Sequence, residues 1–348
     1  MSQSKTVKTS RRTFAKRLMM LGVGSQALLR SGDLKLAVAE AQEAVDQQSA
    51  WPNMTHRQLG RVDFNASRLI FGCGAALSRQ PRDHLLEVAY QAGVNVFDVG
   101  WRPYYNDAEQ NLAPFLKKRR KDIFLISKAQ VVTDLGPHDQ ITVSAARSGA
   151  AQWLASMETS LKELDTEYVD AYYVMAAENP SVIGSEELYR IFEQARQAGK
   201  VGYLGLSSHH NTENVLRMAI KTGWFDLAQI AITPGGWYDW KDKTVLEGTP
   251  SMSELQSFLK QCSDAGIGLI GMKAGRFLAG RKFLGWGNPS AFDAHYDANF
   301  MQAKLTDFQR SYAYVLAHGL DAVNADMQNM LHLRENFAAA ARSHEYFV

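Results

Sequence analysis

The sequence predicts an α/β fold, a (β/α)8 TIM barrel, over residues 54–348, and three observations support this prediction. From Arg68 onward, short apolar or β-branched runs alternate with longer amphipathic windows, as in repeated βα units around a parallel sheet. The alternation provides eight strands and eight helices, the number that a TIM barrel needs. Glycine follows four of the helices, where the chain needs a left-handed residue before the next strand.

The expected elements follow one another in strict order. The strands are the short apolar runs 68–72, 94–98, 123–128, 169–174, 201–207, 226–230, 268–273 and 321–324. The helices are the amphipathic windows 82–92, 107–118, 144–164, 186–198, 212–222, 253–265, 307–318 and 327–341. The glycines expected at helix ends are Gly93, Gly199, Gly223 and Gly266. The segment 54–65, with Gly60 between two mixed runs, is expected to form a hairpin that closes the bottom of the barrel.

Composition narrows the class of function. The chain has 348 residues, of which 46% are hydrophobic and 21% charged, so it is long and apolar enough to bury a large core. The formal net charge is +2 and the basic residues are scattered, which argues against a nucleic-acid groove. Cys73 and Cys262 are far apart and form no Cys-x-x-Cys pair, so we expect two buried free thiols and no metal site.

The first 41 residues resemble a twin-arginine (Tat) export signal. A basic segment without acidic residues contains Ser10-Arg11-Arg12-Thr13-Phe14-Ala15-Lys16, and the modest apolar run 18–29 follows it. That run is too short for a permanent membrane span. Ala37, Ala39 and Ala41 offer cleavage sites, and residues 42–53 form a polar linker. The alternatives are a basic amphipathic helix or an uncleaved anchor.

The export signal implies where the protein is located and how it would hold a cofactor. The Tat translocase would carry the chain out of the cytoplasm, so the mature protein is expected in the periplasm or another extracytoplasmic space. Because this route carries folded proteins and free nicotinamide is scarce outside the cytoplasm, a redox cofactor would be tightly bound or recycled in place.

Polar residues at the carboxyl ends of two neighbouring strands point to an acid–base site. Asp98 ends the strand 94–98, Lys128 ends the strand 123–128, and Tyr105 follows Asp98 in a short loop. In a TIM barrel the chemistry lies at this face. A phenol with a pKa near 10 is a poor acid, and a nearby ammonium favours its phenolate. Taken singly, the three residues could instead be a helix cap, a surface tyrosine and a solvated lysine.

From residue 57 to residue 341 the chain resembles the aldo-keto reductase superfamily. The resemblance rests on motifs in order and spacing: Phe97-Asp98, Pro103-Tyr104-Tyr105-Asn106 with Glu109, Ile126-Ser127-Lys128, Tyr168-Val169-Asp170, Gly205-Leu206-Ser207-Ser208, Asp226-Leu227-Ala228-Gln229, Gly271-Met272-Lys273 and Arg334-Glu335-Asn336. It implies that Asp98, Tyr105 and Lys128 hold the catalytic aspartate, tyrosine and lysine positions. Tyr105 is preferred over Tyr104 because it stands four residues before Glu109.

The fourth catalytic position departs from the family pattern. The family has histidine at the end of Asp-x-Tyr-x-x-His, and this chain has Met175 at the end of Asp170-Ala171-Tyr172-Tyr173-Val174-Met175. A thioether cannot donate a hydrogen bond to a carbonyl oxygen. Loss of one such donor lowers a rate by about 10²–10³. Reduction would therefore be slowed. His209 and His210, at the exit of the fifth strand, are either structural or replace the missing proton relay.

The resemblance also implies a nicotinamide dinucleotide, NADP or NAD. Residues expected to bind it are Ser207, Ser208, Gln229, Lys273, Gly275, Arg276, Arg334, Glu335 and Asn336. The aromatic that usually stacks on nicotinamide after the sixth strand is absent, so Trp237 or Tyr238 would have to supply that face. Asp326 would accept from a ribose hydroxyl and weaken the preference for NADP, or it caps the last helix.

The expected substrate is a small carbonyl, alcohol or sugar-like compound. Its pocket would be lined by Trp101, Arg102, Trp237, Tyr238 and Trp240, and Arg102 could hold an acidic group. The leading hypothesis is an exported oxidoreductase in which Tyr105 is the acid and base. The alternative is a non-redox barrel, a binding protein or a degenerate enzyme, that has lost the cofactor.

Overall fold

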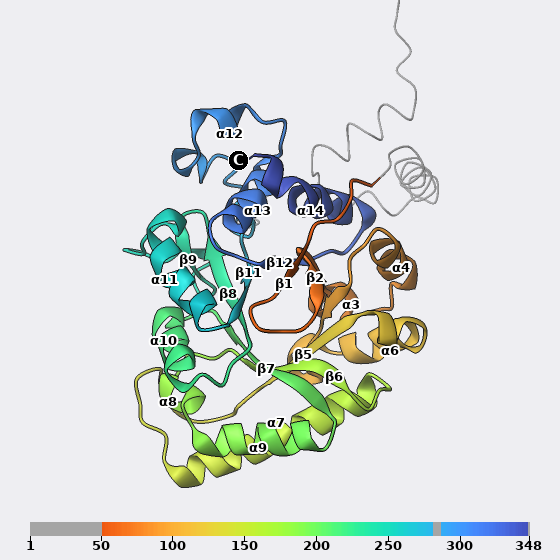
Figure 1. Cartoon of the computed structure of the whole chain (residues 1–348), viewed down its shortest axis with the longest axis vertical. Helices are drawn as coiled ribbons and strands as arrows, with labels where there is room; N and C mark the ends of the chain where they lie inside the picture. The colour runs from red at the N-terminus through yellow and green to blue at the C-terminus, as the bar shows by residue number, and fades with distance from the viewer. Residues whose placement is uncertain (1–50, 281–286, 347–348) are drawn as a thin grey trace, which may run out of the picture.

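The computed structural model describes residues 51–280 and 287–346, and within them eight parallel strands close into a barrel (Figure 1). The closed order is β3-β4-β5-β6-β7-β8-β11-β12, with β12 paired to β3 and β7 paired to β8. Their bounds are β3 (Leu69–Gly72), β4 (Val96–Asp98), β5 (Phe124–Gln130), β6 (Val169–Met175), β7 (Val201–Ser208), β8 (Leu227–Thr233), β11 (Gly268–Met272) and β12 (Ala322–Asp326). The predicted barrel and its strands are confirmed.

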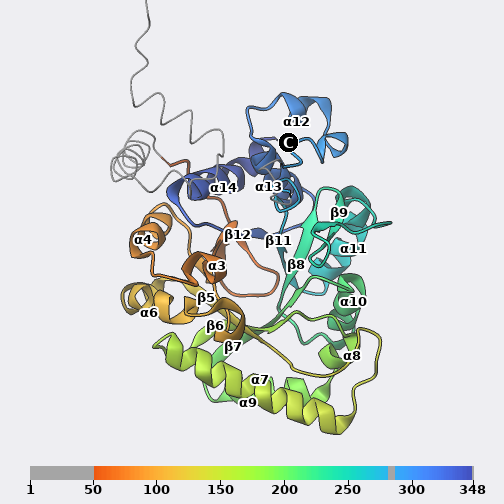
Figure 2. The same ribbon diagram turned by 180° about the vertical axis from the view of Figure 1, so that it is seen from behind.

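Helices surround the barrel, as the views from both sides show (Figures 1 and 2). The eight predicted ones are α4 (Asp83–Gln91), α6 (Ala108–Arg119), α7 (Val143–Glu163), α9 (Glu186–Gln197), α10 (Thr212–Thr222), α11 (Met252–Asp264), α13 (Asp307–Ala317) and α14 (Met330–Arg342). Short helices that the sequence did not predict are α3 (Cys73–Leu77), α5 (Arg102–Tyr105), α8 (Pro180–Ile183), α12 (Ala298–Gln302), η1 (Arg120–Asp122), η2 (Asp293–His295) and η3 (Ser343–Glu345).

Local sequence sets the helix ends. All four glycines predicted to follow helices have positive φ, from 69° at Gly223 to 109° at Gly93, a region that a β-carbon disfavours. Two helices begin with a capping box, Ser251 with Glu254 on α11 and Thr306 with Gln309 on α13. These caps satisfy backbone groups that would otherwise lack partners, and they fix where each strand-to-helix loop ends.

Side-chain alternation along the strands decides which residues reach the barrel interior. On β4, Val96 belongs to the interior cluster and Phe97 to the layer under the helices. On β5, Phe124 and Ile126 are interior, whereas Leu125 packs outward. Successive side chains of a strand point to opposite faces. Asp98 and Lys128 therefore continue the interior rows of their strands.

A small hairpin closes the amino-terminal end of the barrel, as the segment 54–65 predicted. Strands β1 (His56–Gln58) and β2 (Asn65–Ser67) pair antiparallel, and Leu59 and Val62 join the interior cluster. A β-carbon at Gly60, where φ is +53°, would lie 2.3 Å from the backbone nitrogen of Gly268. The close approach of these backbones explains why glycine stands at this turn.

A second hairpin, not predicted from the sequence, extends β8 beyond the barrel. Strand β9 (Gly236–Asp239) pairs antiparallel with β8 and then with β10 (Thr244–Val245). Its Tyr238 packs with Ala231 and Met272 beside the carboxyl ends of β8 and β11. The hairpin thus forms one wall of the barrel mouth.

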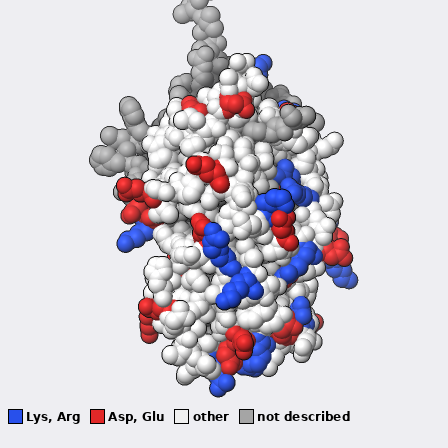
Figure 3. Space-filling view, turned by 60° about the vertical axis from the view of Figure 1, so that its left-hand side comes forward, with Lys and Arg blue, Asp and Glu red and all other residues white. Residues whose placement is uncertain are grey.

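The described surface carries charges of both signs, and Figure 3 shows basic and acidic side chains interspersed on one face. Among the described residues, no helix is long and apolar enough to cross a membrane. Both cysteines are buried free thiols, as predicted. The predicted signal segment 1–41 and most of the linker 42–53 lie outside the described residues.

Candidate active site

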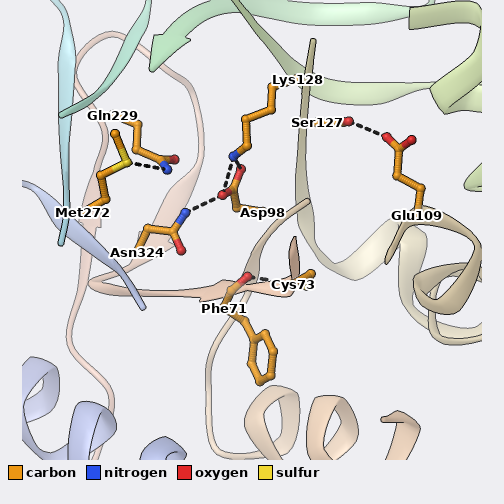
Figure 4. Close-up of polar contacts among 9 residues, drawn as sticks. All are labelled: Phe71, Cys73, Asp98, Glu109, Ser127, Lys128, Gln229, Met272 and Asn324. Carbon is orange, nitrogen blue, oxygen red and sulfur yellow. Dashed lines mark hydrogen bonds and ion pairs between the residues drawn. The ribbon is translucent and has the colours of Figure 1, made fainter. Parts of the chain in front are cut away.

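A buried ion pair lies at the mouth of the barrel. The ammonium of Lys128 on β5 is 2.5 Å from Asp98 Oδ1 and 2.6 Å from Oδ2, and Asp98 is the last residue of β4 (Figure 4). Asp98 is 4% exposed and Lys128 is 2% exposed. Because both groups are removed from water, each depends on the other. Removal of one partner of such a pair costs about 3–5 kcal/mol.

Asn324 on β12 completes this group, and the sequence did not single it out as a site residue. Its amide donates a hydrogen bond to Asp98 Oδ2, so the carboxylate accepts from both an ammonium and an amide (Figure 4). Gly72 leaves the space, because a β-carbon there would lie 2.7 Å from Asn324 Oδ1. One feature of the sequence could have identified Asn324: it is a polar residue near the carboxyl end of a predicted barrel strand.

Tyr105 ends α5 and lies between two glycines. A β-carbon at Gly74 would lie 2.4 Å from its ring, and one at Gly100 would lie 2.9 Å from both its ring and the Lys128 side chain. The ring therefore runs alongside the aliphatic part of Lys128. Tyr104, by contrast, is 48% exposed. The geometry favours Tyr105 over Tyr104 as the phenol of the site.

The protonation state of Tyr105 differs from the expectation. Burial and the negative charge of Asp98 raise the pKa of Tyr105 well above its usual value. The predicted shift toward the phenolate is wrong in direction, because burial disfavours the charged phenolate and the Asp98 carboxylate adds to this effect. The Lys128 ammonium is held by both oxygens of Asp98. Among the described residues, no hydrogen bond joins the Tyr105 hydroxyl to Lys128. Tyr105 is thus a protonated phenol at neutral pH.

Met175 ends β6 and is 5% exposed. It borders a cavity of about 240 Å³, together with Gln130 and Asn179. Two residues earlier, Tyr173 leans over Gly205, and its ring lies 5.9 Å below the Lys128 ammonium. Within the described part of the chain, the buried Tyr173 hydroxyl has no hydrogen-bond partner. Met175 therefore borders open space, and the same strand carries a buried hydroxyl without a partner among the described residues.

Gln229 and Ser207 lie side by side on β8 and β7, in register, and both are buried. Gln229 Nε2 is 3.5 Å from the sulfur of Met272, while its Oε1 has no hydrogen-bond partner among residues that the structure describes. The Ser208 hydroxyl is already engaged locally, with Thr212 and with the carbonyl of His210. An unpaired buried carbonyl at this position is suited to accept from the amide group of a ligand.

The loop after β11 begins at Lys273, whose φ is +69°. Burial, the first cause, and the nearby cations Lys128, Lys243 and Arg276 lower the pKa of Lys273 to about 8. Gly275 packs closely in this loop, because a β-carbon there would lie 2.8 Å from the Phe308 ring. This loop brings positive charge to the mouth.

The residues expected at an adenosine end are partly occupied by contacts within the chain. Arg334 lies over the Trp51 ring at 4.4 Å, and Glu335 accepts a hydrogen bond from Thr306 at 2.6 Å. Asn336 is buried on the same helix, α14. Asp326 ends β12 and does not cap α14. Its alternative role is wrong, because the Asn329 side chain accepts from the first turn of that helix.

The aromatic residues proposed to line the pocket divide into two groups. Tyr238 packs at the mouth with Met272, whereas Trp237 packs outward into the layer under the helices. Trp101 donates its backbone N–H to the carbonyl of Lys128 and so lies beside the ion pair. Arg102 is half exposed and pairs with Asp107 at 2.6 Å and Glu163 at 3.1 Å. Its charge is therefore already balanced by two carboxylates.

His209 follows β7 and lies against Trp240, with ring centroids 5.7 Å apart. Burial and the neighbouring cations, Lys273 first, lower the pKa of His209 to about 3. His209 is consequently a neutral imidazole, able to donate one hydrogen bond and accept another. No group of three or more His, Cys, Asp or Glu side chains within the described ranges could hold a metal ion.

A cleft on the outer side of the barrel lies away from these groups. Its volume is about 730 Å³, and it lies between the segment 137–143, the start of α9 and the outer face of α10. None of the predicted catalytic or cofactor residues lines it. The side chains suited to catalysis are therefore the buried, paired ones at the barrel mouth, and not those around this cleft.

Comparison with known proteins identifies the family of the chain. The model of the Aldo/keto reductase family matches residues 68–344. An uncharacterized oxidoreductase of Bacillus subtilis is 23% identical over 293 residues, covering 82% of this chain and 91% of that protein. A protein of Glycine max described as probable aldo-keto reductase 1 is 28% identical over 224 residues, covering 62% of this chain and 61% of its own length.

A solved aldo-keto reductase from Bacillus halodurans has the same fold. The TM-score is 0.59 at 19% identity, and the alignment covers 84% of this chain and 95% of that one. At this identity the likeness is one of fold. The family match extends over most of the chain and includes all eight strands of the barrel, whereas the bottom hairpin of β1 and β2 precedes it. The chain therefore belongs to the aldo/keto reductase family.

Proposed function

We propose that this protein is an NAD(P)-dependent oxidoreductase that interconverts a small carbonyl compound and its alcohol, with Tyr105 as acid and base. The observation that carries the proposal is the buried Asp98–Lys128 pair beside the Tyr105 ring, at the barrel face where TIM-barrel enzymes place their chemistry. Membership of a reductase family supports the same reaction class.

Tyr105 is protonated at neutral pH and so holds the proton that reduction of a carbonyl oxygen needs. Its raised pKa also makes it a weaker acid than a free phenol, so the transfer depends on stabilisation of the phenolate that forms. The nicotinamide, when bound, supplies the hydride to the carbonyl carbon. As the proton leaves, negative charge develops on the Tyr105 oxygen, and the Lys128 ammonium stabilises it. Asp98 and Asn324 hold that ammonium in place, directly and through the shared carboxylate.

The residues at the nicotinamide end fit a carboxamide. The unpaired Oε1 of Gln229 can accept from its amide nitrogen, and Ser207 lies beside it in register. Lys273 and Arg276 would supply positive charge for a pyrophosphate. Ser208 fits less well, since its hydroxyl is used within the chain. Tyr238 rather than Trp237 would supply an aromatic face, because only Tyr238 packs at the mouth.

Titration of both reduced dinucleotides into the full protein tests the proposal. We expect saturable quenching of protein fluorescence by NADPH or NADH, and consumption of the bound dinucleotide when an aromatic or sugar-like aldehyde is added. Protein that binds neither dinucleotide and turns over no aldehyde would refute it.

Asp326→Ser tests which of the two dinucleotides the protein prefers. A gain in NADPH affinity is expected, because a carboxylate repels a 2′-phosphate.

We also propose that the protein acts outside the cytoplasm. The run Ser10-Arg11-Arg12-Thr13-Phe14-Ala15-Lys16 and the apolar segment 18–29 support export through the Tat translocase. Fractionation of cells that express the wild type and the variant with both Arg11 and Arg12 changed to Lys decides this. Wild type is expected in the periplasm, and the variant in the cytoplasm.

A non-redox barrel is the second candidate. Two observations favour it: Met175 cannot donate to a carbonyl oxygen, and Arg334 and Glu335 are engaged within the chain. On this alternative the protein would bind a small molecule at the mouth without a dinucleotide. The titration above separates the two candidates.

A further inference from the structure

Gln130 and Met175 are direct neighbours on two barrel strands. Their Cα atoms are partners in the parallel register of β5 and β6, and each residue is the last of its strand. Neighbouring strands of a sheet lie about 4.8 Å apart, so the two side chains start from adjacent points at the carboxyl-terminal end of the barrel. Both residues also border the cavity of about 240 Å³.

Strand alternation directs both side chains toward the barrel interior. On β5, Ile126 belongs to the interior cluster, and Lys128 and Gln130 follow it at every second residue. On β6, Tyr173 belongs to the same cluster and Met175 follows it in the same way. Gln130 therefore stands about 6–7 Å beyond Lys128 along the strand, at the face where TIM barrels bind their substrates.

The amide of Gln130 has no hydrogen-bond partner within the part of the chain that the structure describes, and the residue is partly buried. Most side chains around the cavity are apolar. Asn179, another amide on the cavity wall, already donates to the carbonyls of Gly136 and Asp139. Of these two amides, Gln130 is the one left to donate to a ligand.

We propose that the Gln130 amide donates to the substrate carbonyl oxygen the hydrogen bond that Met175 cannot supply. This inference rests on the proposed reductase function and deepens it, because it names a second donor of that site. Side-chain amides stabilise oxygens on which negative charge develops. In the reaction the oxygen receives its proton from Tyr105, and the carbon receives a hydride from the reduced nicotinamide. Gln130 loses no proton, and its hydrogen bond strengthens as charge grows on the oxygen.

Gln130→Met tests this role, because it removes the amide and keeps an unbranched side chain of similar length. We expect kcat for an aldehyde to fall by about 10²–10³, while the affinity for the reduced dinucleotide is unchanged. Gln140→Met, the same substitution at an exposed position in the loop after β5, is the matched control and should keep the wild-type kcat. Thermal melts check that both variants are folded.

The double variant Gln130→Met with Met175→His separates a lost donor from a packing defect. Because the two positions are neighbours, the imidazole that Met175→His introduces should recover about tenfold or more of the kcat that Gln130→Met loses. It should add less to wild type, where the amide already holds the oxygen. A purely structural role for Gln130 predicts no such recovery.

The inference is overturned by a wild-type kcat in Gln130→Met, or by a loss of kcat that the folded double variant does not recover. It is also overturned if His209→Phe lowers kcat and Gln130→Met does not, because the donor would then be His209, the neutral imidazole at the exit of β7. Each of these results leaves the reductase proposal intact. A wild type that reduces no aldehyde refutes both.

Discussion

Asp98 is the residue that joins three strands into one site. It ends β4, accepts from Lys128 on β5 and accepts from Asn324 on β12. Strand alternation predicted that Asp98 and Lys128 face the same interior, because each continues an apolar interior row. It could not predict which partner the ammonium takes. That choice depends on side-chain distances. Burial, with the Asp98 charge, raises the Tyr105 pKa where the sequence predicted a lower one.

Met175→His tests whether the missing donor limits the rate. The residue borders a cavity of about 240 Å³, so an imidazole has space and can be hydrated. If the pocket reduces carbonyls, the new donor should increase kcat by up to about 10²–10³. Turnover of an aldehyde panel and thermal melts of both proteins measure this. A variant with unchanged kcat and a loss of about 1–3 kcal/mol of stability would instead indicate a remodelled, apolar pocket.

Glu109 should make stability depend on pH. It is fully buried and accepts from Ser127, and burial raises its pKa from 4.5 to about 7. The folded protein therefore holds a proton between these pH values that the unfolded chain has released. The resulting stability is present below pH 4.5 and is lost as pH rises through 7.

Glu109→Gln removes this titration. Relative to wild type, the variant should gain up to about 3 kcal/mol of unfolding free energy as pH rises through that window. Denaturant unfolding at several pH values measures the difference, with Glu186→Gln on the exposed side of α9 as the matched control. A wild-type-to-variant difference that stays constant across the window would contradict this account of Glu109.

At the scale of elements, the regular strands and helices were predictable and the irregular ones were not. Barrel strands and their helices carry long periodic patterns, so their positions follow from the sequence. The β9–β10 hairpin was missed because β10 has only two residues, Thr244 and Val245, and no periodicity. The cap of α14 was also misassigned, since Asn329 and Asp326 are both suitable capping residues.

Helix α3 should control activity through its contact with Tyr105. A β-carbon at Gly74 would lie 2.4 Å from the Tyr105 ring, so Gly74→Ala must displace that ring. A misplacement of about 1 Å can cost about 10²-fold in rate, and we expect a fall in kcat of that order. Steady-state turnover and a thermal melt measure the effect. Ala75→Ser, at an exposed position of the same helix, is the control, and wild-type kcat in Gly74→Ala would show that Tyr105 is not held as described.

At the scale of the whole molecule, the barrel separates stability from chemistry. The hairpin of β1 and β2 fills the bottom with Leu59 and Val62, while the ion pair and Tyr105 lie at the opposite end. This division is general in TIM barrels. It explains why the fold could be derived from repeated patterns, whereas the site had to be assembled from single residues on separate strands and loops.

The most direct test of the central claim is Tyr105→Phe, which removes only the hydroxyl. The account predicts that the variant still binds the reduced dinucleotide, and that its rate of aldehyde-dependent dinucleotide oxidation falls by about 10²–10⁴. The measurement is loss of reduced-nicotinamide absorbance in wild type and variant under identical conditions. A variant that oxidises the dinucleotide at the wild-type rate would contradict the proposed role of Tyr105 and the mechanism built on it.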